Sequence, residues 1–390
     1  MAADSETESP SPQIFIPNEW STAADLIACG AVSFPIAFVC GPKKSGKTTF
    51  ARHLVNVLLQ RYSFADLNPV GDWKVILSVM LRHKRVAFLD TDVGQTEFTP
   101  PGLLALTVID KITPDLTIPC VKTPARCFFF GDISSKRDPT TYLTYIKALY
   151  DHYMETEIQG AGLPLVINTP GWVKGIGYEI LVEMLRYISV THVVKLQRLV
   201  LARNLPDGAF WLNEGDADAT TTTVIEINAP SQNHLTSTAP MREDARLLRD
   251  LRLMAYFRQC FPSDTSISTI KELSHALASH PPYEIPISSI KIKHLHCQVA
   301  TTETFYSLNA TIVGMAISSV SEQLPQCVGL GIVRAVDTFK GVLYVITPVP
   351  PHILEDVDLL LQGFIQIPIS LLQVQGCISP YLSTNVLSTN

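Results

Sequence analysis

The sequence predicts an α/β fold in which a parallel sheet flanked by helices is followed by a smaller β-rich domain. Through the first half of the chain, short apolar runs alternate with helical patterns, as is typical of parallel strands buried on both faces. After a Pro-rich stretch at 280–286, apolar runs are separated by Gly, Pro and polar clusters, which indicates a small antiparallel module. We therefore expect a core domain at 14–280 and a β-rich domain at 281–390. An acidic, Ser/Pro-rich and disordered lead-in is expected at 1–13.

The elements of both domains are expected in a definite order. In the core, strands are expected at 31–40, 85–89, 102–109, 163–167 and 191–194, and helices at 48–61, 178–188 and 241–261. A polar, Thr-rich stretch at 207–240 separates the last of these helices from the rest of the core. In the second domain, strands are expected at 290–299, 305–317, 328–336, 341–346 and 364–369.

Composition excludes several classes of protein. The chain has 390 residues, of which 46% are hydrophobic, and no stretch approaches the ~18 consecutive apolar residues of a membrane span. The net charge of −6 argues against a broadly basic nucleic-acid-binding surface but permits a local basic groove. None of the eight cysteines forms a C-x-x-C pair, so reduced thiols are expected rather than a disulfide framework. His294, His296 and Cys297 cluster, but further ligands at suitable spacing for a metal site are missing from the sequence.

The strongest motif follows the first apolar run. Residues 41–48 match the P-loop pattern G-x-x-x-x-G-K-[ST] at a strand-to-helix junction, which predicts a P-loop NTPase core. The glycines let backbone N–H groups converge on phosphate oxygens, and the N-terminus of the helix adds its positive dipole end. Lys47 is expected to reach the β- and γ-phosphates of ATP, and Thr48 to offer its hydroxyl to Mg²⁺. The residues expected to bind ATP are Gly41, Pro42, Lys43, Lys44, Ser45, Gly46, Lys47, Thr48 and Thr49.

Two carboxylates follow the second apolar run. Asp90 fits the end of a Walker B strand, where it would join Thr48 in holding Mg²⁺. Asp92 would then accept a proton from an attacking hydroxyl. The alternative is that one of the two carboxylates only caps a turn. Gln95 is a candidate for the substrate or phosphate side of the same site.

A turn at Thr169–Trp172 follows the fourth apolar run. Parallel strands end at the same edge of the sheet, so this turn is expected near the phosphates, where Trp172 would stack on a nucleobase. Thr169, Pro170, Gly171 and Trp172 are therefore candidate substrate-binding residues. The alternative is a tryptophan that closes the edge of the core. The sequence lacks Asn-Lys-x-Asp, so guanine specificity of the usual GTPase kind has no support.

The helix at 241–261 carries an arginine-rich face. Arg242, Arg246 and Arg249 lie within about 60° on a helical wheel, with Arg252 at the edge. Leu247, Leu248, Leu251 and Met254 fall on the opposite side. One interpretation is a lid whose arginines neutralise a transferring phosphoryl group, and the other is a solvated face.

Together these motifs resemble the polynucleotide 5′-hydroxyl kinases. The segments at 41–49, 89–102 and 168–173 are most similar to the nucleolar, ribosomal-RNA-processing branch, which is related to the kinase subunit of the pre-mRNA cleavage complex. The resemblance implies transfer of the γ-phosphoryl group of ATP to the 5′-hydroxyl of RNA, or of DNA. It implies that Asp92, with Asp90 nearby, activates the nucleophile and that Trp172 clasps the 5′ end of the substrate. It also implies that Arg246, Arg249 or Arg252 acts on the transition state.

The resemblance also implies nuclear or nucleolar placement and an RNA-processing nuclease complex as partner. Members usually carry a β-rich domain before the P-loop, whereas only about 40 residues precede it here. This difference keeps open a non-catalytic ATP-binding subunit of an RNA-processing complex. A third hypothesis is a small-molecule kinase, which the tryptophan turn disfavours. The segment around Ile16, Pro17 and Trp20 is expected to pack beside the nucleotide.

Overall fold

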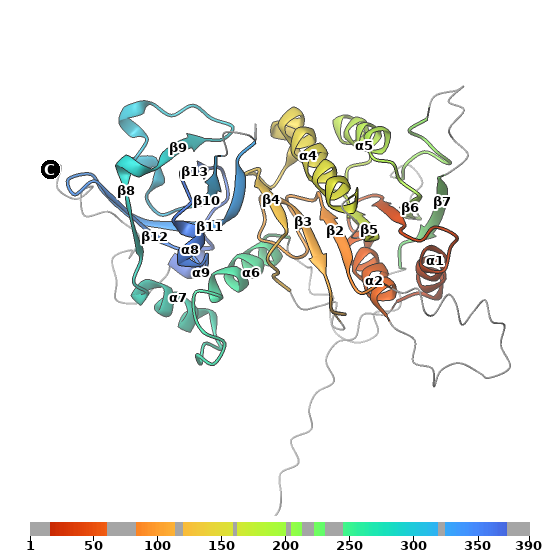
Figure 1. The fold of residues 1–390 in the computed structure, drawn as a ribbon, viewed down its shortest axis with the longest axis horizontal. Coiled ribbons are helices and arrows are strands. Elements are labelled where there is room, and N and C mark those ends of the chain that lie inside the picture. Colours follow the sequence, from red (N-terminus) through yellow and green to blue (C-terminus); the bar gives the residue numbers. More distant parts are fainter. Residues whose placement is uncertain are drawn as a thin grey trace, which may run out of the picture.

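The computed structural model describes residues 16–60, 83–113, 120–158, 162–199, 204–212, 222–230, 245–318 and 324–372. Two sheets lie side by side, and the predicted α/β fold class with a second, β-rich part is confirmed (Figure 1). The expected lead-in at 1–13 lies outside the described residues. None of the helices in the described ranges combines the length and apolar character needed to cross a bilayer.

Within the described residues, the first sheet has seven strands in the order β4-β3-β2-β5-β1-β6-β7. Their bounds are β1 Ile36–Cys40, β2 Val86–Asp90, β3 Leu103–Ile109, β4 Arg126–Phe129, β5 Leu165–Asn168, β6 His192–Gln197 and β7 Thr223–Asn228.

The sheet is parallel apart from β3, which runs antiparallel to both of its neighbours. The prediction that the strand at 102–109 belongs to an all-parallel set is therefore wrong. A parallel connection needs a crossover of a dozen or more residues, usually a helix. The segment between β2 and β3 contains no helix, so the chain turns back beside the strand it has just left.

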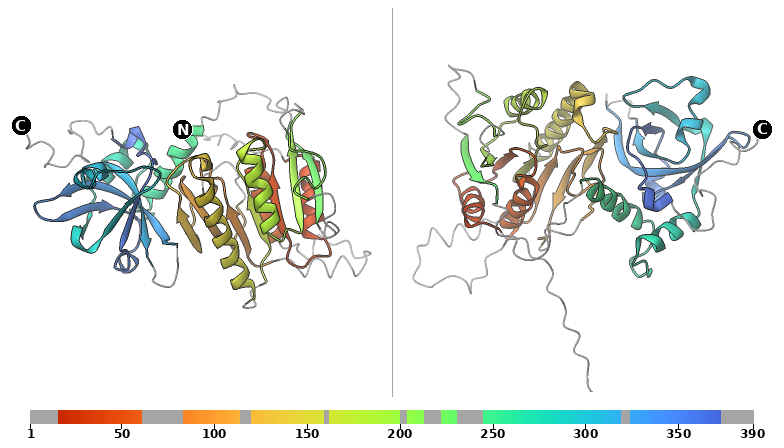
Figure 2. Two further views of the ribbon diagram at one scale, coloured as in Figure 1. Left: turned by 90° about the horizontal axis from the view of Figure 1, so that it is seen from above. Right: turned by 180° about the vertical axis from the view of Figure 1, so that it is seen from behind.

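Helices cover both faces of the first sheet. They are α1 Asn18–Ala28, α2 Lys47–Leu59, α4 Pro139–Ile158 and α5 Ile176–Tyr187. Helices α4 and α5 lie on one face, and α1 and α2 lie on the other (Figures 1 and 2). Successive side chains of β1 point to opposite faces of the sheet. Phe38 packs in the hydrophobic cluster under α4 and α5, and Val39 packs in the cluster under α1 and α2.

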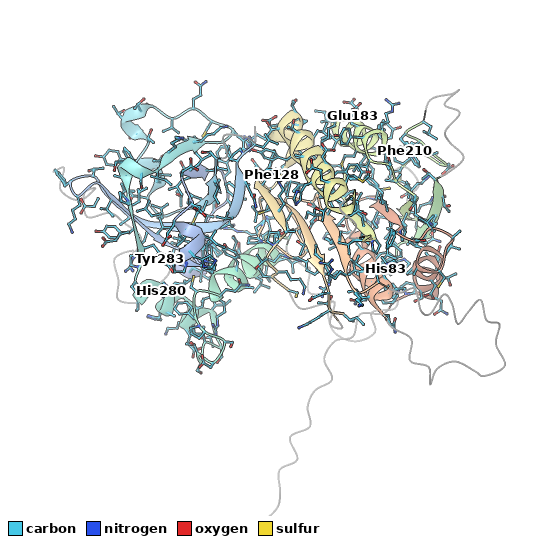
Figure 3. All side chains as sticks on the ribbon, in the orientation of Figure 1. His83, Phe128, Glu183, Phe210, His280 and Tyr283 are labelled. Atoms are coloured by element: carbon cyan, nitrogen blue, oxygen red, sulfur yellow. The ribbon has the colours of Figure 1, made fainter. Side chains whose placement is uncertain are left out.

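Helix α4 is absent from the sequence-based expectations, although a signal for it exists. Asp138 accepts a hydrogen bond from the backbone N–H of Thr141 at 3.0 Å, and Pro139 begins the helix. An aspartate cap followed by proline is a common helix start. The helix packs on the sheet through aromatic rings: Phe128, labelled in Figure 3, stacks on Tyr145 with ring centroids 4.8 Å apart.

The second sheet has the order β8-β12-β11-β10-β13-β9 and is antiparallel, except that β13 and β9 are parallel. Its strands are β8 Tyr283–Pro286, β9 Lys291–His294, β10 Thr311–Ile317, β11 Gln326–Asp337, β12 Val342–Ile346 and β13 Leu359–Gln362. Short helices accompany it: α8 Pro351–Leu354, α9 Ile369–Leu372 and the 3-10 turns Ile287–Ser289, Thr301–Glu303 and Tyr306–Leu308.

The strand predicted at 364–369 is wrong, because the last strand is β13 and the chain then leaves the sheet. Ile365 and Ile367 are nevertheless buried. The alternating apolar pattern thus predicted the burial of these two side chains correctly, but not their secondary structure. Ile365 packs against Gly102 of the first sheet rather than extending a strand. Pro368 also lacks the N–H that a ladder requires.

Helix α6 Ala245–Arg258 lies at the junction of the two sheets, and helix α7 Ile270–Ser279 lies beneath the second sheet (Figure 1). Their buried faces include Leu253 and Leu277, in a cluster that also contains Phe129 of β4 and Leu330 of β11. The helical-wheel expectation for Leu247 is wrong, because this side chain is 40% exposed. The division of the chain at residues 280 and 281 stays a prediction.

Candidate active site

The loop between β1 and α2 has the backbone that a phosphate-binding loop needs. Gly41 and Gly46 have φ values of 145° and 92°, in the region that favours glycine. A Cβ on Gly46 would lie 2.4 Å from the ring of Trp20. The buried Trp20 donates from Nε1 to the carbonyl of Asn228 at 2.9 Å and packs edge-on against Phe50. Helix α1 thus supports the loop from below, and contact of its residues with nucleotide stays a prediction.

The P-loop contains two buried polar side chains, those of Lys47 and Ser45. Lys47 donates from Nζ to the carbonyl of Pro42 at 3.0 Å. Burial lowers the pKa of Lys47 to about 8, although the nearby charge of Asp92 acts in the opposite direction. The buried hydroxyl of Ser45 has no hydrogen-bond partner among the described residues. Thr48 and Thr49 stand half-buried in the first turn of α2, and Lys43 and Lys44 are exposed.

Asp90 ends β2 and is buried beneath the loop that follows. Its carboxylate accepts hydrogen bonds from the N–H of Glu97 at 2.6 Å and from Nδ2 of Asn168 at 3.1 Å. Burial nevertheless raises its pKa to about 7, because those donors only partly offset the loss of solvent. Helix α4 holds the same turn, since Tyr142 donates its hydroxyl to the carbonyl of Thr91 at 2.6 Å.

Asp92 is partly exposed and points its carboxylate into its own turn. Its Oδ1 accepts from the N–H groups of Gly94 and Gln95, each at 3.1 Å. This oxygen therefore caps the turn, and a catalytic role for Asp92 stays a prediction. Within the part of the chain that the structure describes, Oδ2 accepts no hydrogen bond. Gln95 donates from Nε2 to the carbonyl of Ala245 at 3.1 Å and so joins this turn to the start of α6.

The turn after β5 packs directly on the P-loop. A Cβ on Gly171 would lie 2.7 Å from the backbone N of Lys43. Trp172 is half-buried, and the ammonium of Lys136 lies 4.6 Å from its ring centroid. Thr169 and Pro170 are buried, and the hydroxyl of Thr169 donates to the carbonyl of Val39 at 2.8 Å. The structure thus brings Gly171 to the phosphate loop and uses the Thr169 side chain inside the sheet, while Trp172 packs on Gly177 of α5 and against the core.

The arginines of α6 occupy different environments. Arg252 is 11% exposed and contacts Glu97 at 3.3 Å, and Glu97 also binds the buried Arg52 of α2 at 2.7 Å. Arg246 is exposed and Arg249 is half-buried. Arg242 lies outside the described residues. Sequence reasoning missed Glu97, which ties α2 and α6 together directly beside Asp90.

Removing Glu97 should destabilise the fold. In Glu97→Ala, the buried Arg52 and the largely covered Arg252 lose their shared carboxylate, and breaking a buried pair typically costs about 3–5 kcal/mol. We expect urea denaturation to show a free energy of unfolding lower by this amount. The matched control is Lys340→Ala, because Lys340 is 71% exposed and lies 3.9 Å from Asp337. An exposed pair contributes about 0–1 kcal/mol. Equal losses in the two variants would contradict the assignment of Glu97.

The loop from Gly131 to Asp138 also borders the site and was not foreseen. It contains the 3-10 turn Ser135–Arg137 and leads from β4 into α4. A Cβ on Gly94 would lie 2.6 Å from the carbonyl oxygen of Ile133, so this loop packs on the Asp92 turn. The adjacent basic residues Lys136 and Arg137, between a strand and a helix start, are the signal that could have identified it.

Comparison with known proteins places this arrangement in a family. A polynucleotide 5′-hydroxyl-kinase NOL9 of Arabidopsis thaliana is 55% identical over 392 residues, covering 99% of this chain and 100% of that protein. The chain belongs to the NOL9 family of polynucleotide 5′-hydroxyl kinases. The NOL9 proteins of Danio rerio and Homo sapiens are 31% and 27% identical, over 93% and 90% of this chain. This chain spans 51% and 52% of their lengths, about half of each.

Two family models also match this NOL9-family chain. A NOL9-like, C-terminal domain matches residues 278–368, and an mRNA cleavage and polyadenylation factor CLP1 P-loop matches residues 74–259. Among solved structures, a chain of the Clp1p–Pcf11p complex superposes with a TM-score of 0.57 at 14% identity. The match covers 89% of this chain and 78% of that one. At this identity the likeness shows the shared fold.

Proposed function

We propose that this chain transfers the γ-phosphoryl group of ATP to the 5′-hydroxyl of RNA. The observation that carries the proposal is the meeting of three elements at one edge of the sheet. These are the P-loop with Lys47, the Asp92 turn, and the Gly171–Trp172 turn that packs on the loop. An aromatic side chain beside a phosphate loop suits an acceptor that carries a nucleobase. The printed names of the relatives support the same activity.

The P-loop fits the phosphates of ATP. The buried Ser45 hydroxyl lacks a partner among the described residues, and a phosphate oxygen would satisfy it. The N–H groups in the first turn of α2 form the positive end of the helix dipole, and this end faces the same loop. The Lys47 ammonium would exchange the Pro42 carbonyl for phosphate oxygens. All nine residues from Gly41 to Thr49 belong to this binding loop in our proposal.

The residues that would hold Mg²⁺ are Thr48, through its hydroxyl, and Asp90. Asp90 accepts three N–H groups, from Glu97, Asn168 and Asp92. A carboxylate has about four acceptor positions, so one remains for a metal-bound water. When bound, Mg²⁺ neutralises charge on the β- and γ-phosphates. No cluster of three or more metal-binding His, Cys, Asp or Glu side chains occurs in the described ranges, which suits an ion held largely by phosphate and water.

The proposed transfer follows from the position of Asp92. The 5′-hydroxyl oxygen attacks the γ-phosphorus, the bond from this phosphorus to the β,γ-bridging oxygen breaks, and ADP leaves. The hydroxyl proton passes to Oδ2 of Asp92, while Oδ1 stays fixed by Gly94 and Gln95. Lys47 stabilises the charge that develops on the phosphates. Of the α6 arginines, Arg252 contacts Glu97, and Arg246, Arg249 and Arg252 all stay candidates for neutralising the transferring group.

The proposed acceptor side is the turn from Thr169 to Trp172 together with Gln95. Trp172 offers its ring to the 5′ base, and Gly171 permits close approach to the loop. Thr169 and Pro170 hold the turn in place, and Gln95 anchors α6 beside it. We further assign the chain to ribosomal RNA processing in the nucleus and nucleolus, alongside an RNA-processing nuclease complex. The NOL9 names and the NOL9-like C-terminal match support this assignment.

A labelled-transfer assay tests the proposal. The protein is incubated with γ-labelled ATP, Mg²⁺ and 5′-hydroxyl RNA or DNA oligonucleotides, and the same oligonucleotides with a 5′-phosphate serve as controls. We expect label on the 5′-hydroxyl RNA and none on the 5′-phosphate RNA. We also expect no transfer when EDTA is added. If the protein binds ATP but transfers no label at any Mg²⁺ concentration, it is a non-catalytic ATP-binding subunit instead.

A further inference from the structure

We propose that the polynucleotide continues from the 5′ end along a strip of aromatic and basic side chains that crosses to the loops following β9 and β13 of the second sheet. The aromatic–basic strip consists of Trp172, Lys136, Arg137, Phe364 and His296. This inference rests on the proposed function and deepens it, because it assigns a path to the nucleotides that follow the phosphorylated end. It also gives the second sheet a direct role in binding substrate.

The members of the strip contact one another in sequence. The ammonium of Lys136 lies 4.6 Å from the ring centroid of Trp172. The guanidinium of the next residue, Arg137, lies 4.5 Å from the ring centroid of Phe364. The rings of Phe364 and His296 follow, with centroids 6.4 Å apart and planes inclined by 18°. The strip begins at the residue after Gly171, which packs on Lys43 of the P-loop.

The strip is accessible and its central cation is fixed. Phe364 is 45% exposed, and half of the Arg137 side chain is exposed. The Nε of Arg137 binds the buried carboxylate of Asp132, whose other oxygen accepts the N–H of Ser134 at 2.9 Å. One edge of the guanidinium is thus held by the protein. A single exposed phenylalanine is ordinary on a protein surface. Phe364 differs, because it stacks against a fixed arginine and lies beside a nearly parallel histidine, so the three side chains form an ordered stacking surface.

Backbone contacts hold the two halves of the strip in register. The N–H of Phe364 donates to the carbonyl of Gly131 at 2.6 Å. A Cβ on Gly363 would lie 2.2 Å from that same carbonyl oxygen, so only glycine permits this approach. The Nε2 atom of His296 lies 2.6 Å from the carbonyl oxygen of Phe130. The loop that carries Lys136 and Arg137 is therefore fixed to the second sheet on one side and to the Asp92 turn on the other.

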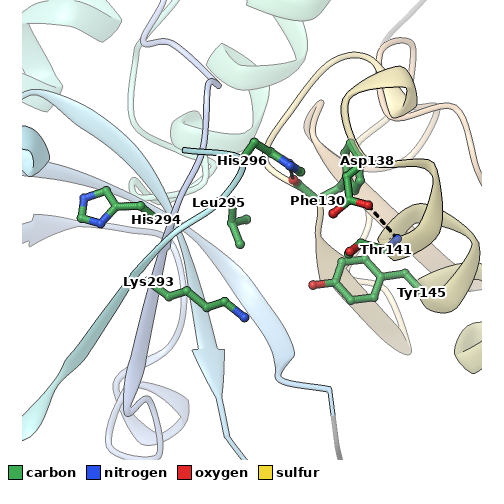
Figure 4. Close-up of a pocket in the computed structure, with 8 residues that line it drawn as sticks. All are labelled: Phe130, Asp138, Thr141, Tyr145, Lys293, His294, Leu295 and His296. Carbon is green, nitrogen blue, oxygen red and sulfur yellow. Dashed lines mark hydrogen bonds between the residues drawn. The ribbon is translucent and has the colours of Figure 1, made fainter. Parts of the chain in front are cut away.

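The strip ends at a cavity of about 160 Å³ between β9 and α4. Figure 4 shows Lys293 extending from the second sheet toward Tyr145 of α4, with His296 and Asp138 above it. Lys293 is exposed and adds a further cation at this end. The basic groups therefore continue past Phe364, in a chain whose net charge is −6.

This pattern fits single-stranded RNA better than a peptide. Each nucleotide brings one base and one phosphate, so a single strand matches surfaces on which cations lie beside aromatic faces. Stacking accepts any base, which suits an enzyme that recognises an end rather than a sequence. Phosphates need only clustered positive charge, even on a protein with negative net charge.

The test compares 5′-hydroxyl RNAs of about three and about twelve nucleotides. We define the length preference as kcat/KM for the longer RNA divided by that for the shorter. In Phe364→Ala we expect the length preference to fall by roughly 5- to 100-fold, as expected for the loss of one stacking platform. Phe364→Tyr keeps the ring and should retain the preference. The matched control is Phe339→Ala, because Phe339 is 88% exposed in the turn between β11 and β12.

A binding arm separates failure of the strip from failure of the proposed function. Fluorescence anisotropy with the longer RNA needs no phosphoryl transfer, and Arg137→Gln should make the slope of log Kd against log salt shallower by about 0.7. If wild-type protein transfers label but Phe364→Ala and Arg137→Gln both behave like Phe339→Ala, the strip is wrong and the proposed function stands. If wild-type protein transfers no label while both variants still weaken binding, the proposed function fails and the strip stands.

Discussion

Replacing Lys47 with alanine is expected to slow label transfer to a 5′-hydroxyl RNA by roughly 10²–10³-fold or more, because one preorganised cation leaves the phosphates. The side chain is buried and already turned over the loop toward the Pro42 carbonyl. Its pKa of about 8 leaves it largely protonated at pH 7 even without a ligand. Initial rates at saturating RNA, together with ATP affinity from calorimetry, measure the effect.

The control for this prediction is an exposed lysine outside the P-loop. Lys340 is 71% exposed in the turn between β11 and β12, so Lys340→Ala removes a lysine of the same charge without touching the buried one. We expect this variant to keep transfer within a few-fold of wild type. If Lys340→Ala were as damaging as Lys47→Ala, the loss of any positive charge would matter rather than the position of Lys47.

The second large effect is expected for Asp92→Asn. Loss of a general base typically slows a reaction by about 10²–10⁴-fold. The asparagine Oδ1 can still accept the N–H groups of Gly94 and Gln95, so the turn should persist. We expect single-turnover transfer to collapse while affinities for ATP and RNA stay near those of wild type. This separation identifies a chemical role rather than a structural one.

Two outcomes would contradict the assignment of Asp92. Near-normal transfer would move the proton acceptor elsewhere, with Asp90 as the nearest carboxylate. A lowered free energy of unfolding in Asp92→Asn would show that its carboxylate mainly stabilises the turn. The matching variant Asp90→Asn should behave differently, because Asp90 is buried under three N–H donors and its substitution disturbs the fold itself.

The sequence was enough to predict that the three motifs meet at one edge of the first sheet, for a physical reason. The P-loop, Asp90 and the turn at Thr169–Trp172 each follow an apolar strand, and the carboxyl ends of parallel strands meet at one edge. Local patterns and sheet geometry were therefore enough to bring them together. The fold class followed from the same alternation of apolar runs and helices.

What sequence reasoning missed depends on contacts between distant segments. Nothing in the local sequence distinguishes Glu97 from other acidic residues. Its role depends on the fold, in which α2 and α6 bring Arg52 and Arg252 into contact with it. Phe364 sits in an alternating pattern that predicted a strand, whereas the structure uses it as an exposed ring beside Arg137. The reversal of β3 depends on the lack of a crossover helix, which single-residue patterns do not report.

The bond between Trp20 and Asn228 has a consequence for how the protein matures. It joins residues 208 positions apart and supports the loop around Gly46 from below. Translation proceeds from the N-terminus, and domains begin to fold as they emerge. The loop around Gly46 is made before β7, so this support is complete only once β7 has left the ribosome. The nascent chain therefore gains a fully supported phosphate site only after the other strands of the first sheet have been made.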